Sequence, residues 1–352
     1  MHQSNTTQIT DEYLIVSIAK VVIYSLLSIV GIIGNLFNLI TIYQSPSLRT
    51  LNNAFLIALT INDFICATIG FPLQIATLLI CNRLLCLTQA TFVTTVNAYS
   101  VALTACVSID RCHAVLAPYD YIRRSTRGKY IFLILSLIVT PIVLSVLPLT
   151  GLEDHGFGNY TRLYASTCWI SLIVDKSNVI IITLFTTFIT LTALIIMICY
   201  IILFSIAYNK SNRDLANQTG IRTSVRTVLL LVGTNMICWI PMSVITFIGL
   251  VQYYATKTSF IVHNVLSDVV LDLSCCNVAL NPIIYLLTNS ILRRKFKSLV
   301  RILTRKTRIE PLSYEGNQRP TASRNTRSSL FQSLISRRIS YTVNKEKVIR
   351  DN

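Results

Sequence analysis

Seven long apolar segments constrain this chain more than any other feature of its sequence. A helix that crosses a membrane needs about 20 mainly apolar residues, and such segments occupy residues 16–43, 51–80, 86–115, 129–149, 178–208, 223–252 and 263–287. Of the 352 residues, 53% are hydrophobic and only 13% are charged, which excludes an ordinary soluble domain. The sequence therefore predicts an all-α membrane protein, a seven-transmembrane helix bundle over residues 16–288.

Basic residues in the short connections indicate how the bundle is oriented. They collect after the third, fifth and seventh segments, at Arg123, Arg124, Arg127, Lys129, Lys210, Arg213, Arg293, Arg294, Lys295, Lys297 and Arg301. The opposite connections hold only Arg83, Arg162, Lys176 and Lys257. Because basic loops stay in the cytoplasm, residues 1–15 are predicted to be extracellular in a multi-pass plasma-membrane protein. The formal charge of +16 then indicates contact with anionic membrane lipids and not with nucleic acid.

Two further segments follow the last span. Residues 289–304 have an apolar and a basic face, which predicts an amphipathic eighth helix on the inner membrane surface. Residues 305–352 hold few large apolar side chains, so we expect a disordered cytoplasmic tail. Its candidate phosphorylation sites are Ser323, Thr326, Ser328, Ser329, Ser333, Ser336 and Ser340.

The predicted outer side carries two kinds of modification signal. Asn5 and Asn159 each begin an Asn-x-Thr sequence, so both are candidate glycosylation sites. Three cysteines, Cys81, Cys86 and Cys168, lie on the same oxidising side. An odd number leaves one thiol without a partner among the three.

Several polar side chains lie at membrane depth, where such groups are costly and indicate function by default. Asp63, Ser100, Asn277 and Asn281 would all be satisfied if they converged between helices. Oxygen ligands of this kind suit a small hard cation such as sodium. A plain hydrogen-bond cluster that joins helices is the alternative.

The stretch SIDRCHAVLAP, residues 108–118, ends the third apolar segment with an acid and a base. Asp110 and Arg111 could form an ordinary solvated helix end, part of a metal site, or a charged switch. Cys112 and His113 are adjacent, so their side chains point to different helix faces and no second pair lies nearby, which disfavours a metal. No nucleophile triad or metal-ligand spacing is visible, so the sequence does not indicate an enzyme.

Placed in chain order, these landmarks resemble the rhodopsin-like (class A) G-protein-coupled receptors over residues 16–304. Each motif alone is weak, and the resemblance rests on their joint order: Gly34-Asn35, Asn62-Asp63, Cys86, Asp110-Arg111, Pro118, Cys168, Tyr200, Cys238-Trp239-Ile240-Pro241 and Asn281-Pro282-Ile283-Ile284-Tyr285.

The resemblance implies roles for individual residues. Cys86 and Cys168 would form a disulfide, leaving Cys81 as the odd thiol. Asp63, Ser100, Asn277 and Asn281 would bind an allosteric sodium ion. The residues expected to couple ligand to a heterotrimeric G protein are Asp110, Arg111, Tyr200, Trp239, Pro241, Asn281, Pro282 and Tyr285. The phosphorylated tail would recruit an arrestin.

Departures from the family pattern mark this chain as divergent. At six positions this chain carries a residue that differs from the usual one. They are Cys112 in place of a tyrosine, Ile138 near the position of a tryptophan, Thr192 in place of a proline, Asn235 in place of an aromatic residue, Leu292 in place of a phenylalanine, and Ile221 in place of the acid that many members keep. Without that acid, Arg111 would be held chiefly by Asp110. We therefore expect ligand-independent signalling.

The ligand pocket implied by the resemblance is apolar with a few polar groups. Its candidate residues are Gln89, Val93, Asn97, Phe185, Phe188, Trp239, Met242, Ser243, Thr246, Asp268 and Leu271. Val93 stands where amine receptors carry an aspartate, so a monoamine held by a salt bridge there is disfavoured. Cys275 stands where opsins carry the retinal lysine, so no retinal cofactor is expected. Asp268 could meet a cationic group of a ligand or could be a solvated helix end.

The principal hypothesis is thus a receptor with an unknown extracellular ligand. The alternatives are a non-retinal opsin-like relative or orphan receptor with constitutive signalling, and a multi-span transporter. A transporter is disfavoured because it should line several spans with charges and pair broken helices in its two halves.

Overall fold

A computed structural model describes residues 2–162, 167–211, 219–260 and 264–306, although not every side chain at the ends of these ranges. Within them, seven helical segments are long and apolar enough to cross a membrane, which confirms the predicted bundle. The spans are Leu14–Gln44, Leu51–Leu79, Arg83–Leu116, Arg127–Leu149, Val179–Ile206, Gly233–Thr256 and Leu266–Thr288. Residues 1–301 form one compact unit.

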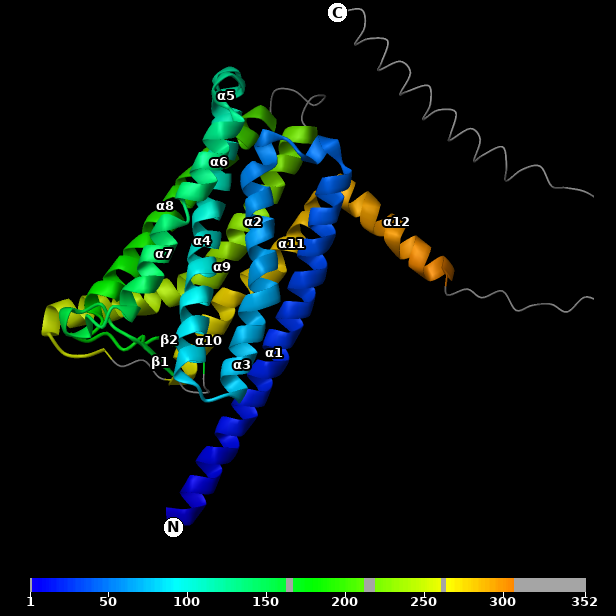
Figure 1. The fold of residues 1–352 in the computed structure, drawn as a ribbon. Coiled ribbons are helices and arrows are strands. Elements are labelled where there is room, and N and C mark those ends of the chain that lie inside the picture. Colours follow the sequence, from blue (N-terminus) through cyan, green and yellow to red (C-terminus); the bar gives the residue numbers. More distant parts are fainter. Residues whose placement is uncertain (1, 163–166, 212–218, 261–263, 307–352) are drawn as a thin grey trace, which may run out of the picture. The chain divides into compact units, whose positions relative to one another are not determined.

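The main elements are labelled in Figure 1. They are α1 (His2–Gln44), α2 (Ala54–Ile65), α3 (Phe71–Leu79), α4 (Arg83–Leu116), α5 (Pro118–Arg124), α6 (Arg127–Ser136), α7 (Val139–Val146), β1 (Tyr160–Arg162), β2 (Cys168–Ile170), α8 (Val179–Ser211), α9 (Thr219–Thr256), α10 (Asn264–Cys275), α11 (Asn277–Thr288) and α12 (Ser290–Lys306). Short 3₁₀ turns cover Pro46–Leu48, Leu51–Asn53, Leu147–Leu149 and Glu153–His155. The β1–β2 hairpin lies at the end of the bundle where α4 begins, and α5 lies at the opposite end (Figure 1).

Helix α4 is the centre of the bundle. It packs against α2, α7, α8 and α9, and most of its residues are buried. Its sequence holds neither proline nor glycine, so the backbone hydrogen bonds run unbroken across the membrane. The other helices expose large apolar side chains such as Ile33 and Phe247, as expected for surfaces that face lipid.

Prolines interrupt several of the other spans, because each removes one backbone donor. A π-helical turn, Cys66–Gly70, joins α2 to α3 just before Pro72. The fourth span breaks at Leu137 and Ile138, four and three residues before Pro141. The missing donor of Pro141 would have bonded the carbonyl of Leu137, so the break lies where that bond is lost.

The contact between α1 and α11 explains why Gly34 and Asn35 occupy these positions. A Cβ atom added at Gly34 would lie 2.7 Å from the Pro282 ring, so only glycine allows α1 to approach α11 there. The Asn35 side chain donates at 3.3 Å to the carbonyl of Val278, four residues before Pro282. This is the carbonyl that loses its helical partner because of Pro282.

Thr192 stands in α8 where the family usually has a proline, and its side chain bonds the carbonyl groups of the preceding turn. Its hydroxyl donates to the carbonyl of Phe188 at 2.9 Å and lies 2.8 Å from that of Ile189. A proline at residue 192 would leave the same Phe188 carbonyl without its backbone donor. A threonine that bonds back to this carbonyl favours a local bend by another route.

Helix α12 confirms the predicted amphipathic eighth helix. Leu292 is buried against Ile284 and Tyr285 of α11, and the Phe296 ring packs edge-on against Phe37 of α1. Leu292 thus fills the contact expected of the usual phenylalanine. The tail phosphorylation sites from Ser323 to Ser340, and the side chains of Asn5 and Ile221, lie outside the described residues.

Candidate functional site

A small cavity lies within the bundle between α4, α8 and α9, with a volume of about 30 Å³. Its floor includes Trp239 and its walls include Phe185 and Phe188. Polar groups are few, with Asn97, Thr94 and Thr246 among them. An apolar lining with a few fixed polar groups is typical of a small-molecule site.

The outer loop closes this cavity. Trp169 and Ile170 of β2, followed by Leu172, line the cavity and are buried. The strand β2 pairs antiparallel with β1, with Thr161 opposite Trp169. These residues were not among the predicted pocket residues, although their position next to Cys168 indicates that they lie over helix α4.

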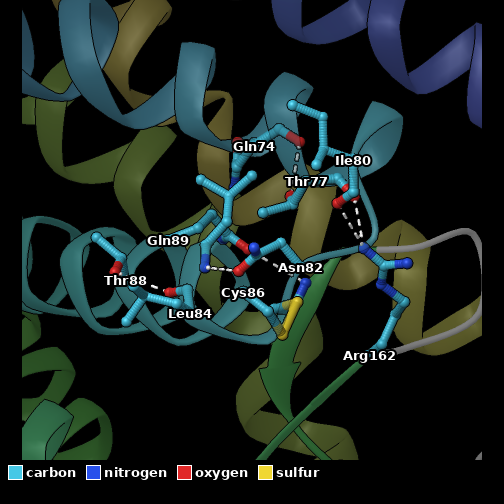
Figure 2. Close-up of a disulfide and its surroundings, with 11 residues drawn as sticks. Gln74, Thr77, Ile80, Asn82, Leu84, Cys86, Thr88, Gln89 and Arg162 are labelled. Atoms are coloured by element: carbon cyan, nitrogen blue, oxygen red, sulfur yellow. Dashed lines mark hydrogen bonds between the residues drawn. A yellow bond between two sulfur atoms is a disulfide. The ribbon is translucent and has the colours of Figure 1, made fainter.

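The expected disulfide is confirmed, since Cys86 and Cys168 are bonded and their Cα atoms lie 5.4 Å apart. Figure 2 shows how the surrounding contacts hold the loop. Gln89 of α4 accepts a hydrogen bond from the backbone nitrogen of Cys168 at 3.2 Å. On β1, Arg162 donates to the carbonyls of Thr77 and Ile80 at 2.9 and 3.0 Å (Figure 2). A cation on these terminal carbonyls also matches the negative end of the α3 dipole.

Tyr160 fixes the other side of the loop. Its hydroxyl donates to the carbonyl of Ser145 in α7 at 2.9 Å. Burial raises the pKa of this phenol to about 12, so it stays a neutral donor at physiological pH. Asn159 beside it is exposed and donates to Glu153, so this candidate glycosylation site is accessible. Cys81 is an exposed free thiol.

Six of the eleven candidate pocket residues line the cavity: Asn97, Phe185, Phe188, Trp239, Met242 and Thr246. The other five do not. Gln89 is used by the outer loop, and Ser243 donates to the carbonyl of Trp239 on its own helix. Val93 and Leu271 are buried in the surrounding apolar core. Asp268 is 4% exposed, so its interpretation as a solvated helix end is wrong.

Asp268 forms an ion pair that the sequence analysis missed. The ammonium group of Lys20 in α1 lies 3.1 Å from Asp268 and 3.8 Å from Asp272, both in α10. Lys20 is a lone basic residue inside an apolar run, which is itself a signal to search other spans for acids. Asp268 is therefore already paired and faces α1, away from the cavity.

A larger groove of about 1050 Å³ runs along the outside of α2, α4 and α7. Its lining includes Ile61, Leu84 and Ile142, which are exposed and mostly apolar. Ile138, which stands near the expected tryptophan, is part of this lining. This groove lies on the outer surface of the bundle, whereas the small cavity lies among buried residues of α4, α8 and α9.

Below the cavity, Asp63, Ser100, Asn277 and Asn281 converge between α2, α4 and α11. Asn281 donates to Asp63 at 2.7 Å, Ser100 lies 3.5 Å from Asp63, and Asn277 lies 3.4 Å from Ser100. All four residues are buried. The side-chain oxygen of Asn277 is buried without a hydrogen-bond donor. This oxygen set fits a small hard cation, which would supply the missing positive charge beside Asp63.

At the inner end, Asp110 is held mainly by two tyrosines. The Tyr130 hydroxyl donates a short hydrogen bond to Asp110 Oδ1, and the Tyr121 hydroxyl lies 3.0 Å from the same oxygen. Tyr121 also lies 2.9 Å from the side-chain oxygen of Asn52. Burial, together with bonds to Tyr130 and Asp110, raises the pKa of Tyr121. The phenol is therefore a stable neutral donor toward the carboxylate.

Arg111 is more loosely held. Its guanidinium lies 3.8 Å from Asp110 and 3.4 Å from the side-chain oxygen of Asn53. Asp110 is thus not its sole partner, and the Asn53 contact was missing from the sequence analysis. Tyr200 packs against the apolar cluster around Leu203, and the buried Tyr285 hydroxyl makes no hydrogen bond with the described residues.

The comparisons with known proteins agree with this geometry. The family model "7 transmembrane receptor (rhodopsin family)" matches residues 34–285. Neuromedin-U receptor 2 of Mus musculus is 29% identical over 297 residues, which cover 79% of this chain and 74% of that protein. Histamine H2 receptor of Cavia porcellus is 26% identical over 291 residues, covering 79% and 78%.

Among solved structures, squid rhodopsin has a similar fold, with a TM-score of 0.67 at 19% identity over 82% of this chain and 86% of that chain. The matched proteins are receptors and the family is not enzymatic, so the chain is not an enzyme. Because the family model covers most of the sequence, from Gly34 to Tyr285, the chain belongs to the rhodopsin family of seven-transmembrane receptors.

Proposed function

We propose that this receptor binds an extracellular ligand between α4, α8 and α9 and thereby activates heterotrimeric G proteins. The observation that supports this most directly is the cavity above Trp239, closed from outside by the disulfide-held strand β2. The N-terminus is extracellular and the chain lies in the plasma membrane in this proposal. A ligand larger than the small cavity enters only when Trp169 and its neighbours move.

The ligand contacts in this proposal are mainly apolar and aromatic. Asn97, Thr94 and Thr246 supply the polar groups, and Lys20 neutralises Asp268 outside the cavity. A cationic ligand group therefore has no free carboxylate among the cavity residues. The relatives are named for neuromedin-U and for histamine, and two such different names do not choose a ligand for this chain. The absence of a lysine at Cys275 argues against retinal.

At the inner face, we assign G-protein coupling to Arg111, Tyr200 and Tyr285. Movement of α9, pivoting near Trp239 and Pro241, opens a groove beside Arg111. The basic inner connections and α12 contact anionic lipids, and the phosphorylated tail recruits an arrestin. The Asp63 cluster holds a sodium ion that favours the resting state.

Basal signalling without a ligand is the second candidate property. The 3.8 Å separation between Arg111 and Asp110 supports it, because Asp110 Oδ1 is bonded to tyrosines and the Arg111 pair is long. The Asp110 carboxylate is buried and already accepts a hydrogen bond from Tyr130, so Arg111 at 3.8 Å is only weakly restrained by it.

The proposed function is tested by G-protein recruitment in cells that express the full chain, with and without peptide, amine, nucleoside and lipid libraries. Arg111→Ala should abolish recruitment while surface expression stays at the wild-type level. Arg123→Ala is the matched control, since Arg123 is exposed on α5 and pairs only with Asp120 at 3.9 Å among the described contacts. Equal recruitment by Arg111→Ala and wild type would contradict the assignment.

A further inference from the structure

The buried ion cluster between α1 and α10 is not part of the ligand cavity or of the inner switch. Lys20 is 3% exposed, and its ammonium lies near the carboxylates of Asp268 and Asp272. Tyr24, one turn after Lys20, donates to Asp272 at 2.5 Å. Four polar groups from two helices thus meet at membrane depth, where ionisable residues are costly and usually functional.

The charges of this cluster do not cancel. Two carboxylates face one ammonium, so the fully ionised cluster carries a net charge of −1 (+1 from Lys20 and −2 from Asp268 and Asp272). Asp268 is buried, and Lys20 is the one charged partner that the described residues give it besides the like-charged Asp272. A buried, uncompensated negative charge is strongly unfavourable in a low-dielectric region. The cluster therefore favours uptake of one positive charge.

Among the described residues, the groups around this cluster supply no second cation. Gln74 of α3 donates its amide to the sulfur of Cys275 at 3.8 Å, and Cys276 donates to the backbone of Asp272. The titratable neighbours among the described residues are thus the Cys275 thiol at the end of α10, the Cys276 thiol that follows it, and the Tyr24 phenol of α1. None of these groups is positively charged in any protonation state.

A proton fits this cluster better than a metal ion does. The ammonium of Lys20 already occupies the position between the two carboxylates that a metal ion would take. A proton needs no coordination shell. The Asp272 side chain is 20% exposed, compared with 5% for Asp268, so the cluster is not sealed on the Asp272 side.

We infer that Lys20, Asp268 and Asp272 form a proton-binding site at the outer end of the bundle, in which the pair of carboxyl groups takes up one proton from the outer solution while the Lys20 ammonium balances the remaining carboxylate. Because the two carboxyls interact closely, the proton belongs to the pair and not to one residue. Binding brings the net charge of the cluster to zero. This inference does not depend on the ligand or G-protein assignments.

Infrared difference spectroscopy of the purified full-length receptor in lipid nanodiscs tests the site. Spectra are recorded from about pH 8 to about pH 6, above the range near 4 where exposed carboxyl groups titrate. Wild type should show the carbonyl band of a protonated carboxyl group, and Asp272→Asn should lose it. The subtraction of the two spectra removes the contribution of Asp63, and histidines give no carbonyl band.

Two further variants keep the test decisive. Asp154→Asn changes an exposed outer carboxyl group and should leave the band intact. Lys20→Gln removes the ammonium, so both carboxyls must be protonated and the band should grow about twofold. The inference is overturned if wild type and Asp272→Asn have the same carbonyl bands at every pH. It is also overturned if raising sodium at fixed pH abolishes the wild-type band, because a metal ion would then occupy the site.

Discussion

The side-chain amide of Asn235 donates a hydrogen bond to the hydroxyl of Thr104 at 3.1 Å and so ties α9 to α4 one turn below Trp239. Both residues are buried. An aromatic residue is expected at residue 235, and it would make only apolar contacts there. In this chain the inner half of α9 is therefore joined to α4 by a polar bond, which would have to break in the proposed outward movement of α9.

Replacing Asn235 with leucine should raise ligand-independent signalling. The variant removes a hydrogen bond whose net contribution is about 1 kcal/mol, so the active population should rise about fivefold. Basal G-protein recruitment per receptor at the cell surface measures this, and Thr104→Val should reproduce the effect. Ser243→Ala is the matched control, because its hydroxyl bonds only its own helix among the described contacts. Unchanged basal recruitment in both variants would refute the restraint.

The tyrosines that hold Asp110 should contribute to stability. Tyr130→Phe leaves the buried carboxylate with one donor fewer, which costs about 1–3 kcal/mol. Thermal unfolding of the purified receptor should therefore begin at a lower temperature. Tyr119→Phe serves as the control, since Tyr119 is 90% exposed on α5. Equal melting temperatures for the two variants would show that the Asp110 contacts add nothing.

The Cys86–Cys168 disulfide should be necessary for the closed outer loop. It joins residues 82 positions apart, and a loop of this length corresponds to about 4 kcal/mol in the chain-entropy treatment. Cys168→Ser should reduce surface delivery and weaken ligand binding, because β2 no longer covers the cavity. Cys81→Ser removes the exposed free thiol and should behave like wild type. A Cys168→Ser receptor that matched wild type in both assays would contradict this role.

The sequence predicted the spans, the disulfide and the eighth helix, because length, apolar content and motif order determine them. It did not place Trp169 and Ile170 in the cavity wall. These residues belong to a short hairpin with β1, and the disulfide from Cys168 to the distant Cys86 holds that hairpin against α4. The surroundings of Asp268 were predicted wrongly for a related reason. Its partner Lys20 lies in the first span and Asp268 in the last. Only the three-dimensional fold brings these two side chains together.

The Asp63 cluster makes a final prediction about sodium. In wild type, sodium should lower agonist affinity, because the ion binds Asp63 and its neighbours in the resting state. Asp63→Asn keeps the size of the side chain but removes the charge that attracts the cation, so agonist binding should become insensitive to sodium. Competition binding at constant ionic strength, with N-methylglucamine replacing sodium, separates ion binding from screening. If Asp63→Asn retains the wild-type sodium effect, the buried amides and hydroxyl around Asp63 act only as a hydrogen-bond cluster between helices.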